Sequence, residues 1–418
     1  MLKSYPKYKD SGVSWIGMVP VGWEVKKLKS CLEKPLQYGA NESGVLFDPQ
    51  LPRYIRITDI VNVNTLTKDN VRSLEIEKAG RYLLKYNDIL LARSGATVGK
   101  SFIYKDDLPS AFAGYLIRAR INKELSPDYF IYYTQSNAYN SWKDIILIQA
   151  TIQNIGANKY NNLEIPLPPR SEQDAIVAYL DDKTAKIDRL IELYKREIEL
   201  LKERRQAVIH KAVTRGLDDK VKLKDSGVSW IGMVPQGWEV LPLKRFCFMK
   251  AGVNLVSTDI NPNVGEYKVY GGNGLRGYYN NYNIDGDYLL VGRQGALCGN
   301  VHRVIGRIWA TEHAVITRVN HKNNIGYVYY MLIAMNLNQY SNDTAAQPGL
   351  AVNVVLNLKT ALPPRTEQDA IVAYLDEQCA KVDAMIGKVQ SKIGLLEEYR
   401  VRLISDVVTG KVRVGPAP

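Results

Sequence analysis

The residues of this chain that are best suited to chemistry include a glycine-rich segment resembling a phosphate-binding loop. SGATVGKS, at residues 94–101, follows an apolar run that is typical of a strand. A phosphate-binding loop of this kind needs four residues between its glycines, whereas Gly95 and Gly99 are separated by three. The corresponding segment RQGALCGN, at residues 293–300, keeps both glycines and has neither the lysine nor the serine. We therefore interpret both segments as tight turns at strand ends and not as nucleotide sites.

Other catalytic patterns are missing as well. The cysteines form no CxxC pair, and the histidines lack the short spacing that places two metal ligands on one element. These residues are Cys31, Cys247, Cys298, Cys379, His210, His302, His313 and His321. No HExxH pair, Gly-x-Ser-x-Gly elbow or dinucleotide fingerprint occurs, and the only Pro-Pro pairs precede arginine, unlike those of amino-methyltransferases. We expect a binding protein and not an enzyme, with no metal and no cofactor of its own.

Charge and hydropathy limit the possible partners. The 418 residues include 55 Lys and Arg against 43 Asp and Glu, a formal net charge of +12. Such an excess favours a polyanionic partner such as nucleic acid. No apolar run approaches the roughly 18 residues that a membrane helix needs, and the first residues lack the apolar core of a signal peptide. We therefore expect a cytoplasmic protein that does not bind a membrane.

Two phrases that occur twice reveal the organisation of the chain. KDSGVSWIGMVP stands at residues 9–20 and again at 224–235, followed each time by one variable residue and GWEV. LPPRSEQDAIVAYLD, at residues 167–181, returns as LPPRTEQDAIVAYLD at 362–376, with one difference in fifteen positions. The segments between these phrases diverge. The chain is therefore a tandem duplication whose copies keep the same ends and differ in their interiors.

After each LPPR the pattern becomes helical. Apolar residues recur at steps of three, four and seven, and each member of the first set has a counterpart 195 positions later in the second. The sets are Ile176, Leu180, Ile187, Ile191, Tyr194, Ile198, Leu201 and Val208, then Ile371, Leu375, Val382, Ile386, Val389, Ile393, Leu396 and Leu403. Ser171 with Asp174, and Thr366 with Asp369, predict capping boxes, and Gly216 and Gly410 predict glycine ends. Each helix is then about 44 residues and about 65 Å long.

An amphipathic helix of this length must cover its apolar stripe. Two helices of the same register are most simply covered by pairing with each other, although each could pack on its own globular domain instead. Both parallel and antiparallel pairs fit the connectivity, and a duplicated unit that closes on itself by a pseudo-two-fold axis favours the antiparallel pair. The two predicted helices are neutral or acidic, so the positive charge belongs to the globular segments and their flanks.

The globular interiors contain short apolar runs separated by Gly, Asn and Pro. RYIRITDI, YNDILLAR, DYLLVGR and HAVITRV predict strands, and SPDYFIYYTQS and IGYVYYMLIAMN predict short helices. We predict an α/β (α+β) fold in which two globular domains are separated by two long helices forming an antiparallel coiled coil. The boundaries are 1–166 for the first domain, 167–216 for the first helix, 217–362 for the second domain, 363–412 for the second helix and 413–418 for a tail.

The order of these phrases, twice over, resembles the specificity subunit of a type I restriction-modification system. The resemblance covers nearly the whole chain, and interior phrases such as IQNIGANKYNNLEIPLPP and VYGGNGLRGYY agree with it. It implies that each interior is a target-recognition domain for one half of a split, asymmetric double-stranded DNA site, and that the long helices are a spacer.

The resemblance also implies partners that supply the catalysis. Two methyltransferase subunits, which methylate adenine with S-adenosylmethionine, are expected to bind this chain. Two restriction and translocase subunits, which use ATP and Mg²⁺, are expected to complete the complex. The rival function is a bivalent protein scaffold without DNA readout, which the basic globular segments argue against.

The candidate DNA-binding residues have side chains that grip bases or phosphates. Arginine can hold guanine, and Asn or Gln can hold adenine, with two hydrogen bonds each. The candidates are Arg56, Arg93, Lys100, Arg118, Gln153 and Asn154 in the first domain and Asn273, Arg276, Tyr278, Arg293, Gln294 and Gln347 in the second. Because Arg93 and Arg293 occupy matching places in both copies, they could instead grip phosphate or brace a turn.

Four aromatic residues are candidates for binding a protein partner: Trp15, Trp230, Tyr194 and Tyr399. Trp15 and Trp230, with Trp23 and Trp238, lie in the duplicated phrase, and identical residues are poor sources of specificity for two different half-sites. We expect these tryptophans to pack against the helices or to contact the methyltransferase.

Overall fold

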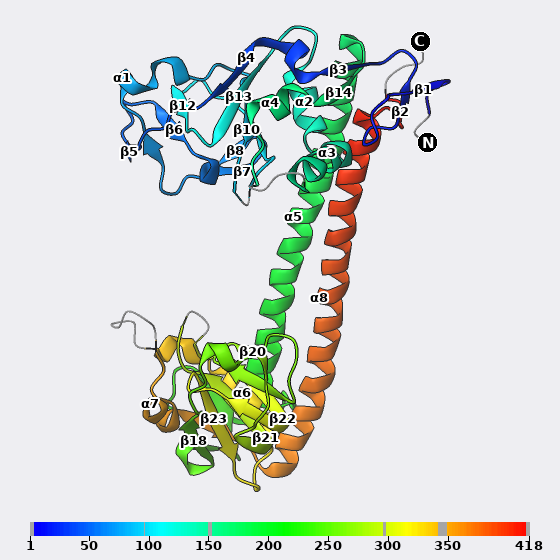
Figure 1. Cartoon of the computed structure of the whole chain (residues 1–418). Helices are drawn as coiled ribbons and strands as arrows, with labels where there is room; N and C mark the ends of the chain where they lie inside the picture. The colour runs from blue at the N-terminus through cyan, green and yellow to red at the C-terminus, as the bar shows by residue number, and fades with distance from the viewer. Residues whose placement is uncertain (1–3, 96, 149–152, 296–297, 342–348, 415–418) are drawn as a thin grey trace. The chain divides into compact units, whose positions relative to one another are not determined.

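The computed structural model describes residues 4–95, 97–148, 153–295, 298–341 and 349–414 (Figure 1). These residues form two compact units. Unit 1 comprises Met1–Tyr194 and Ser391–Pro418, and unit 2 comprises Lys195–Gln390. Each unit therefore contains one globular domain together with parts of both long helices. Among the described residues, no helix is long and apolar enough to cross a membrane.

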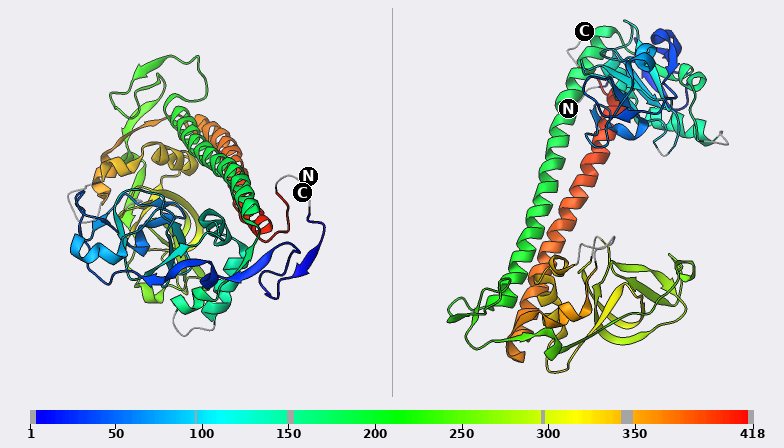
Figure 2. Two further views of the ribbon diagram at one scale, coloured as in Figure 1. Left: turned by 90° about the horizontal axis from the view of Figure 1, so that it is seen from above. Right: turned by 90° about the vertical axis from the view of Figure 1, so that its left-hand side faces the viewer.

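The long helices are α5, Arg170–Arg215, and α8, Arg365–Val408. In unit 1 the first part of α5 packs against the last part of α8, with Ile187 and Ile191 in one apolar cluster with Leu403 and Ile404. In unit 2 the last part of α5 and the first part of α8 share a second cluster. Because the beginning of one helix meets the end of the other in each unit, the pair is antiparallel, as predicted (Figures 1 and 2).

An equivalent ion pair joins the helices in each unit. The Arg400 guanidinium lies 2.9 Å from the Asp188 carboxylate in unit 1, and that of Arg205 lies 3.3 Å from Asp383 in unit 2.

The apolar stripes of the long helices pack on the globular domains as well as on each other. Ile176 and Leu180 share the core of the first domain, as Ile371 and Leu375 share that of the second. Packing on the globular domain, the alternative to pairing, therefore takes place at the first turns of each helix.

The ends of the helices agree with the sequence in part. Gly216 and Gly410 follow the last turns with φ of 74° and 73°, which confirms the predicted glycine ends. The predicted capping boxes are wrong. Each helix begins at an arginine one residue before Ser171 or Thr366, and that arginine donates to the carboxylate proposed for the box, with Arg170 on Asp174 at 3.1 Å and Arg365 on Asp369 at 2.9 Å. The arginine therefore competes successfully for the cap carboxylate.

The first domain contains two four-stranded sheets, in the orders β11-β10-β13-β4 and β12-β6-β9-β5. Two hairpins and a β3-β14 pair complete its strands, and short helices cover the sheet edges. The strands are β1 Tyr8–Asp10, β2 Met18–Pro20, β3 Glu24–Lys27, β4 Leu32–Tyr38, β5 Val45–Leu46, β6 Arg53–Ile55, β7 Ile60–Asn62, β8 Thr65–Leu66, β9 Arg72–Ser73, β10 Ile89–Ala92, β11 Ser101–Ile103, β12 Ser110–Phe112, β13 Leu116–Ile121 and β14 Glu164–Leu167. The helices are α1 Ile76–Ala79, α2 Pro127–Tyr133, α3 Asn137–Ile148 and α4 Ala157–Asn161.

The second domain is built on one six-stranded sheet in the order β18-β23-β21-β22-β19-β20, with a β15-β16 hairpin and a β17-β24 pair. The strands are β15 Leu223–Asp225, β16 Met233–Pro235, β17 Glu239–Pro242, β18 Cys247–Ala251, β19 Tyr267–Gly271, β20 Gly274–Tyr279, β21 Ile284–Gly292, β22 Val301–Ala310, β23 Ala314–Val319 and β24 Lys359–Leu362. The helices are α6 Ile325–Ala334 and α7 Val352–Asn357. The predicted strand runs and the two predicted short helices, α2 and α6, are confirmed.

The two sheet arrangements are variants of one plan. In the first domain β11 pairs with β10 and β12 pairs in parallel with β6, in separate sheets. In the second domain the single strand β22 makes both kinds of contact, antiparallel to β21 and parallel to β19. One continuous ten-residue strand therefore unites into one sheet what the first domain divides into two.

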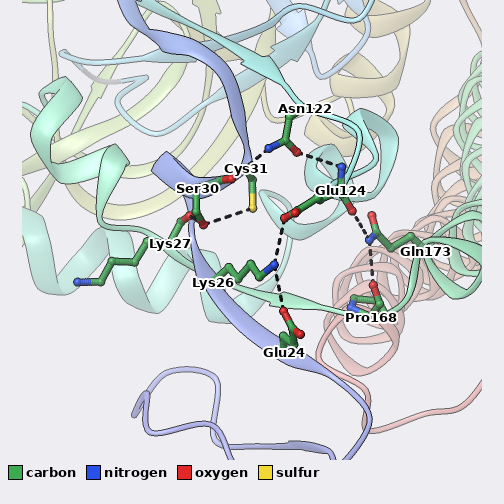
Figure 3. A network of polar contacts seen from close by, with 9 residues as sticks. All are labelled: Glu24, Lys26, Lys27, Ser30, Cys31, Asn122, Glu124, Pro168 and Gln173. Atoms are coloured by element: carbon green, nitrogen blue, oxygen red, sulfur yellow. Dashed lines mark hydrogen bonds and ion pairs between the residues drawn. The ribbon is translucent and has the colours of Figure 1, made fainter.

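Each domain is fixed to its long helix by a buried glutamine. Gln173 donates to the carbonyl oxygens of Glu124 and Pro168 and accepts from the Ser126 N–H, in a network that continues to Lys26 (Figure 3). Gln368 repeats the arrangement in unit 2, accepting from the Asn324 N–H at 2.8 Å and donating to the Pro363 carbonyl at 2.9 Å. A fully bonded amide in a buried place fixes the angle at which each helix leaves its domain.

A buried tyrosine in each unit spans three elements. The Tyr129 hydroxyl contacts the carbonyl oxygens of Pro166 and Val408 at 2.8 and 2.9 Å, so it joins α2, β14 and the end of α8. The Tyr327 hydroxyl contacts those of Ala361 and Val213 at 2.8 and 3.2 Å, and joins α6, β24 and α5. The same three elements therefore meet in both units, with the roles of α5 and α8 exchanged.

The glycine after α8 provides a test of this packing. A side chain at Gly410, where φ is 73°, would be strained and would overlap Pro20, whereas one at Gly394, inside α8, would meet open space. We expect Gly410→Ala to lower the free energy of unfolding by about 1–2 kcal/mol. Gly394→Ala, the matched control, should raise it by about 0.5–1 kcal/mol, since alanine favours helix. Urea unfolding followed by tryptophan fluorescence measures both, and equal effects would contradict the explanation.

Candidate nucleic-acid interface

The glycine-rich segments form the same turn at the end of a core strand in both domains. Gly95 and Gly99 have φ of 77° and 85°, and Gly295 and Gly299 have φ of 88° and 89°. The N–H of Gly99 donates to the Ala92 carbonyl at 2.9 Å, and that of Gly299 donates to Gly292 at 2.8 Å. These bonds close a turn back onto the strand, which confirms the interpretation as strand-end turns. We call residues 93–95 with 97–100, and residues 293–295 with 298–300, the exit turns.

Each exit turn begins with the matching arginine, whose backbone is held on both sides. The Arg93 carbonyl accepts from the Ile155 N–H at 2.8 Å, and the Arg293 carbonyl accepts from the Leu350 N–H at 2.8 Å. Ser94 forms an isolated bridge with Asn154, as Gln294 does with Gly349. In both domains a segment about 60 residues further along the chain is therefore fixed beside the exit turn, which brings Arg93 and Asn154 together.

In the first domain Arg93 lies over an aromatic ring that the sequence analysis missed. Its guanidinium carbon is 4.8 Å from the centre of the Tyr38 ring, and the Tyr38 hydroxyl accepts from the Ala157 N–H at 2.9 Å. Arg93 Nε and Asn154 Oδ1 are both buried without a hydrogen-bond partner among the described residues. A buried donor and a buried acceptor without partners in the described part of the chain therefore lie beside this cation–π contact. Tyr38 has no local motif that marks it, because its partners are far away in the sequence.

Two other candidate arginines have protein partners. Arg56 pairs with Asp59 at 2.7 Å and donates to the Asn70 carbonyl at 2.8 Å, and the bonds to Asp59 raise the pKa of Arg56. Arg118 is only 9% exposed and donates to the Leu83 carbonyl and the Gln37 side chain, and burial lowers its pKa. Both stay predicted DNA contacts, but their guanidinium groups are already held within the domain.

Lys100 lies at a different place from the other candidates. It lines a cleft of ≈ 1150 Å³ between the exit turn, the short helices and the paired long helices of unit 1. Lys105, Lys143 and Arg400 line the same cleft together with Asp128, Asp181 and Asp188. Lys105 pairs with Asp128 at 3.0 Å and Arg400 with Asp188 at 2.9 Å, so the cleft carries little net charge. Gln153 is exposed beside Asn154 and does not line this cleft.

In the second domain three of the candidates gather around one hollow of ≈ 400 Å³. Asn273, Arg276 and Gln294 line it, together with His313 and the glycines of the VYGGNG segment. The glycines are needed because a Cβ at Gly272 would lie 2.9 Å from the His313 carbonyl oxygen. A Cβ at Gly271 would likewise lie 2.5 Å from Arg276 Cδ. Close backbone approach thus places three polar side chains at one point.

Arg293 and Tyr278, two further candidates of the second domain, do not line this hollow. Arg293 is half-buried at the start of the exit turn. Tyr278 is half-buried on β20 and pairs through its backbone with Asn261. Gln347 lies outside the described residues. Among the described residues, no group of three or more His, Cys, Asp or Glu side chains is placed to hold a metal ion.

The candidate partner-binding residues differ in their surroundings. Trp230 donates to the Lys359 carbonyl at 3.1 Å, whereas Trp15 Nε1 is buried without a partner among the described residues. Trp15 lines a hollow of ≈ 760 Å³ with Met18 and Lys411. On the helices, Lys392 lies over the Tyr194 ring with its Nζ 5.3 Å from the ring centre, and Tyr399 is exposed. Tyr399 and the Trp15 hollow are therefore open to a partner.

Comparison with known proteins places the chain in a family. The family model described as "Type I restriction modification DNA specificity domain" matches residues 20–203 and again 235–391, once in each half of the duplication. The chain therefore belongs to this family and is the DNA specificity subunit of a type I restriction-modification system, not a catalytic subunit. The resemblance inferred from the repeated phrases is confirmed.

Individual relatives agree with the family. The chain is 26% identical over 440 residues to the putative type I restriction enzyme MjaX specificity subunit of Methanocaldococcus jannaschii, covering 99% of both proteins. It is 47% identical over 132 residues to the EcoprrI specificity subunit of Escherichia coli, a match that covers 31% of this chain and 33% of that protein.

A solved structure supports the fold. It is described as "Structural basis underlying complex assembly and conformational transition of the type I R-M system", and the similarity covers 93% of this chain and 98% of that one, with a TM-score of 0.67 and 16% identity. The predicted fold, with two globular domains and two long helices in a duplicated chain, is confirmed.

The contacts of Arg56 predict a role in stability. Asp59 is only 2% exposed, so removing its partner leaves a nearly buried carboxylate unpaired. We expect Arg56→Ala to lower the free energy of unfolding by about 2–3 kcal/mol. Urea unfolding measures the loss. Arg56→Ala combined with Asp59→Asn is the control and should recover more than half of it, since the amide carries no charge. Unchanged stability of Arg56→Ala with altered DNA discrimination would instead assign Arg56 to readout.

Proposed function

We propose that this chain recognises a bipartite, asymmetric DNA site, with one half-site for each globular domain. The observation that carries this is the repeated exit turn. Both domains hold the same backbone frame, with an arginine at the same place, and surround it with different side chains. Tyr38 and Asn154 lie beside the turn in the first domain, whereas the second domain has Gln294 within the turn and His313 beside it. One backbone arrangement that carries two different sets of side chains suits two different half-sites.

The recognition domains in this proposal comprise residues 1–166 and 217–362, and residues 167–216 and 363–412 form the spacer helices. The positive charge supports DNA as the ligand, since the chain carries +12 whereas α5 and α8 together carry no net charge. A bivalent protein scaffold, the rival function, needs no such excess of positive charge.

The helices support docking of two copies of one methyltransferase subunit. In unit 1, Leu190 of α5 and Leu395 of α8 are exposed, and their counterparts in unit 2, Met385 and Leu200, are exposed as well. Exposed apolar residues at equivalent places form two similar surfaces, so a single kind of partner can bind to both. Trp15, Trp230, Tyr194 and Tyr399 belong to the same proposed contacts.

The catalytic chemistry belongs to the partners in this proposal. The methyltransferase subunits carry S-adenosylmethionine and methylate adenine in each half-site. Two restriction subunits, which use ATP and Mg²⁺, translocate and cleave the DNA. The complex acts in the cytoplasm. Mapping adenine methylation in cells that contain this chain and its methyltransferase tests the proposal, because a bipartite motif is expected and any single uninterrupted motif would overturn it.

Arg293 is expected to contact a DNA phosphate, because an arginine common to two domains with different targets is a poor source of sequence preference. Arg293→Ala should weaken DNA binding of the methyltransferase complex alike for all sequences, and reduce the slope of log K against log salt by about 1. Arg318→Ala, at the far end of β23 and exposed, is the control that removes the same charge elsewhere. Relaxed choice at a single base pair would assign Arg293 to base readout.

The spacer helices are expected to set the distance between the half-sites. Deleting residues 193–199 and 388–394 removes one heptad from equivalent places of both helices and preserves the apolar stripe. A heptad is about 10 Å of helix, or about three base pairs of DNA. We expect a methylome with the same half-sites and a changed spacer. Replacing the exposed residues of the same heptads without deletion is the control. A spacer of unchanged length in the deletion variant would contradict the role of the helices.

A further inference from the structure

One residue in each domain adjoins the exit-turn arginine in the same way. The Arg93 N–H donates to the Tyr115 carbonyl at 3.0 Å, and the Arg293 N–H donates to the His313 carbonyl at 2.9 Å. Tyr115 and His313 each directly precede a core strand, β13 or β23. The two residues therefore occupy equivalent positions, although the sequences around them, FAGYLIR and TEHAVIT, share no motif.

Both side chains are exposed where the neighbouring strand is buried. Tyr115 is 63% exposed although Leu116, the next residue, is fully buried. The His313 side chain is 41% exposed, and Ala314 after it is also fully buried. The backbone at this position is thus fixed by the core while the ring extends into solvent. A fixed backbone with a free ring limits the entropy that a ring contact with a ligand would cost.

The neighbours of His313 supply the other groups of a base-contacting site. The hollow beside it is lined by Asn273, Arg276 and Gln294, and the Asn300 amide donates to Asn273 Oδ1 at 3.2 Å. That bond orients the Asn273 amide so that its NH₂ group is available as a donor. His313 Nε2 lies 3.0 Å from the Glu312 carboxylate, which leaves Nδ1 for another partner.

The neighbours of Tyr115 differ. Arg93 lies over Tyr38 with a buried, unpartnered Nε, and Asn154 nearby has a buried, unpartnered Oδ1 among the described residues. The Tyr115 side chain makes no hydrogen bond with the described residues. A tyrosine supplies a hydroxyl that donates or accepts, and an apolar ring that can contact a thymine methyl group.

We propose that Tyr115 and His313 are specificity-determining residues, each contacting the edge of one base pair in its half-site. The arginine next to them is the same in both domains and serves the shared geometry. The residue at this position differs, and so the two domains prefer different base pairs there. This inference rests on the proposed function, since it names residues that perform the DNA readout.

The test is the adenine methylome and DNA binding of the full chain with its methyltransferase. Tyr115→Ala should relax one position of one half-site and leave the other half-site unchanged, and His313→Ala should do the reverse. On duplexes substituted at the relaxed position, discrimination should fall about 10-fold. Tyr86→Ala and His321→Ala are matched controls, since they remove an exposed tyrosine and an exposed histidine elsewhere in the same two domains.

Tyr115→Phe and His313→Asn keep a side chain of related shape and guard against variants that fold poorly. Tyr115→Phe removes only the hydroxyl, and it too should change the preference at the same position if the hydroxyl makes the contact. Unchanged half-sites in all four variants would overturn the inference, as would a uniform loss of affinity for every sequence. If the unaltered chain gives no bipartite motif, the proposed function fails. If it gives one and the variants leave it unaltered, only this inference fails.

Discussion

In both units a buried tryptophan lies where the start of one long helix meets the end of the other. The Trp23 indole donates to the Glu172 carboxylate of α5 at 3.1 Å, and its ring faces Gly410 after α8. The Trp238 indole donates to Glu367 of α8 at 2.9 Å and faces Gly216 after α5. A Cβ at either glycine would meet the ring or its neighbours, and both glycines have φ near +74°, so both positions require glycine. The duplicated phrase is therefore a clamp on two helix ends, as expected from packing of these tryptophans against the helices.

This clamp makes each unit depend on both copies of the duplication. Unit 1 needs the end of α8, because unit 1 includes Ser391–Pro418. In unit 1 the Tyr8 hydroxyl donates to the carbonyl of Lys411, which follows α8, at 3.4 Å. Unit 2 needs the end of α5 in the same way. The Glu172 carboxylate also accepts from Tyr5, and burial together with this carboxylate raises the pKa of Tyr5. The identity of the duplicated phrase in both copies is thus explained by its contacts with the helix ends. A residue that makes such contacts is constrained by its partners in the fold.

How much of the fold and of the candidate site could be predicted depends on whether the partners of each residue lie near it in the sequence. The apolar steps of the helices and the glycines at their ends are local patterns, so the helices and the duplication follow from the sequence. Local patterns also marked Asn273, Arg276 and Gln294, which lie between nearby glycines. The partners of Arg118 are Leu83 and Gln37, and nothing in the sequence joins them. The match of Tyr115 with His313 depends on one backbone hydrogen bond, which no periodicity indicates.

The sheets explain how the backbone of the exit turn can stay the same while the two domains diverge in sequence. The first domain divides its strands between two sheets, whereas the second joins them through β22. Yet in both domains the described part of the exit turn closes with the same bonds, because the strand before it, the strand end beside it and one later segment hold it in the same way. The two sheet arrangements therefore place the exit turn on equivalent supports. A surface for a new half-site therefore requires new side chains around the exit turn, while the contacts of the clamp and of the long helices remain as they are.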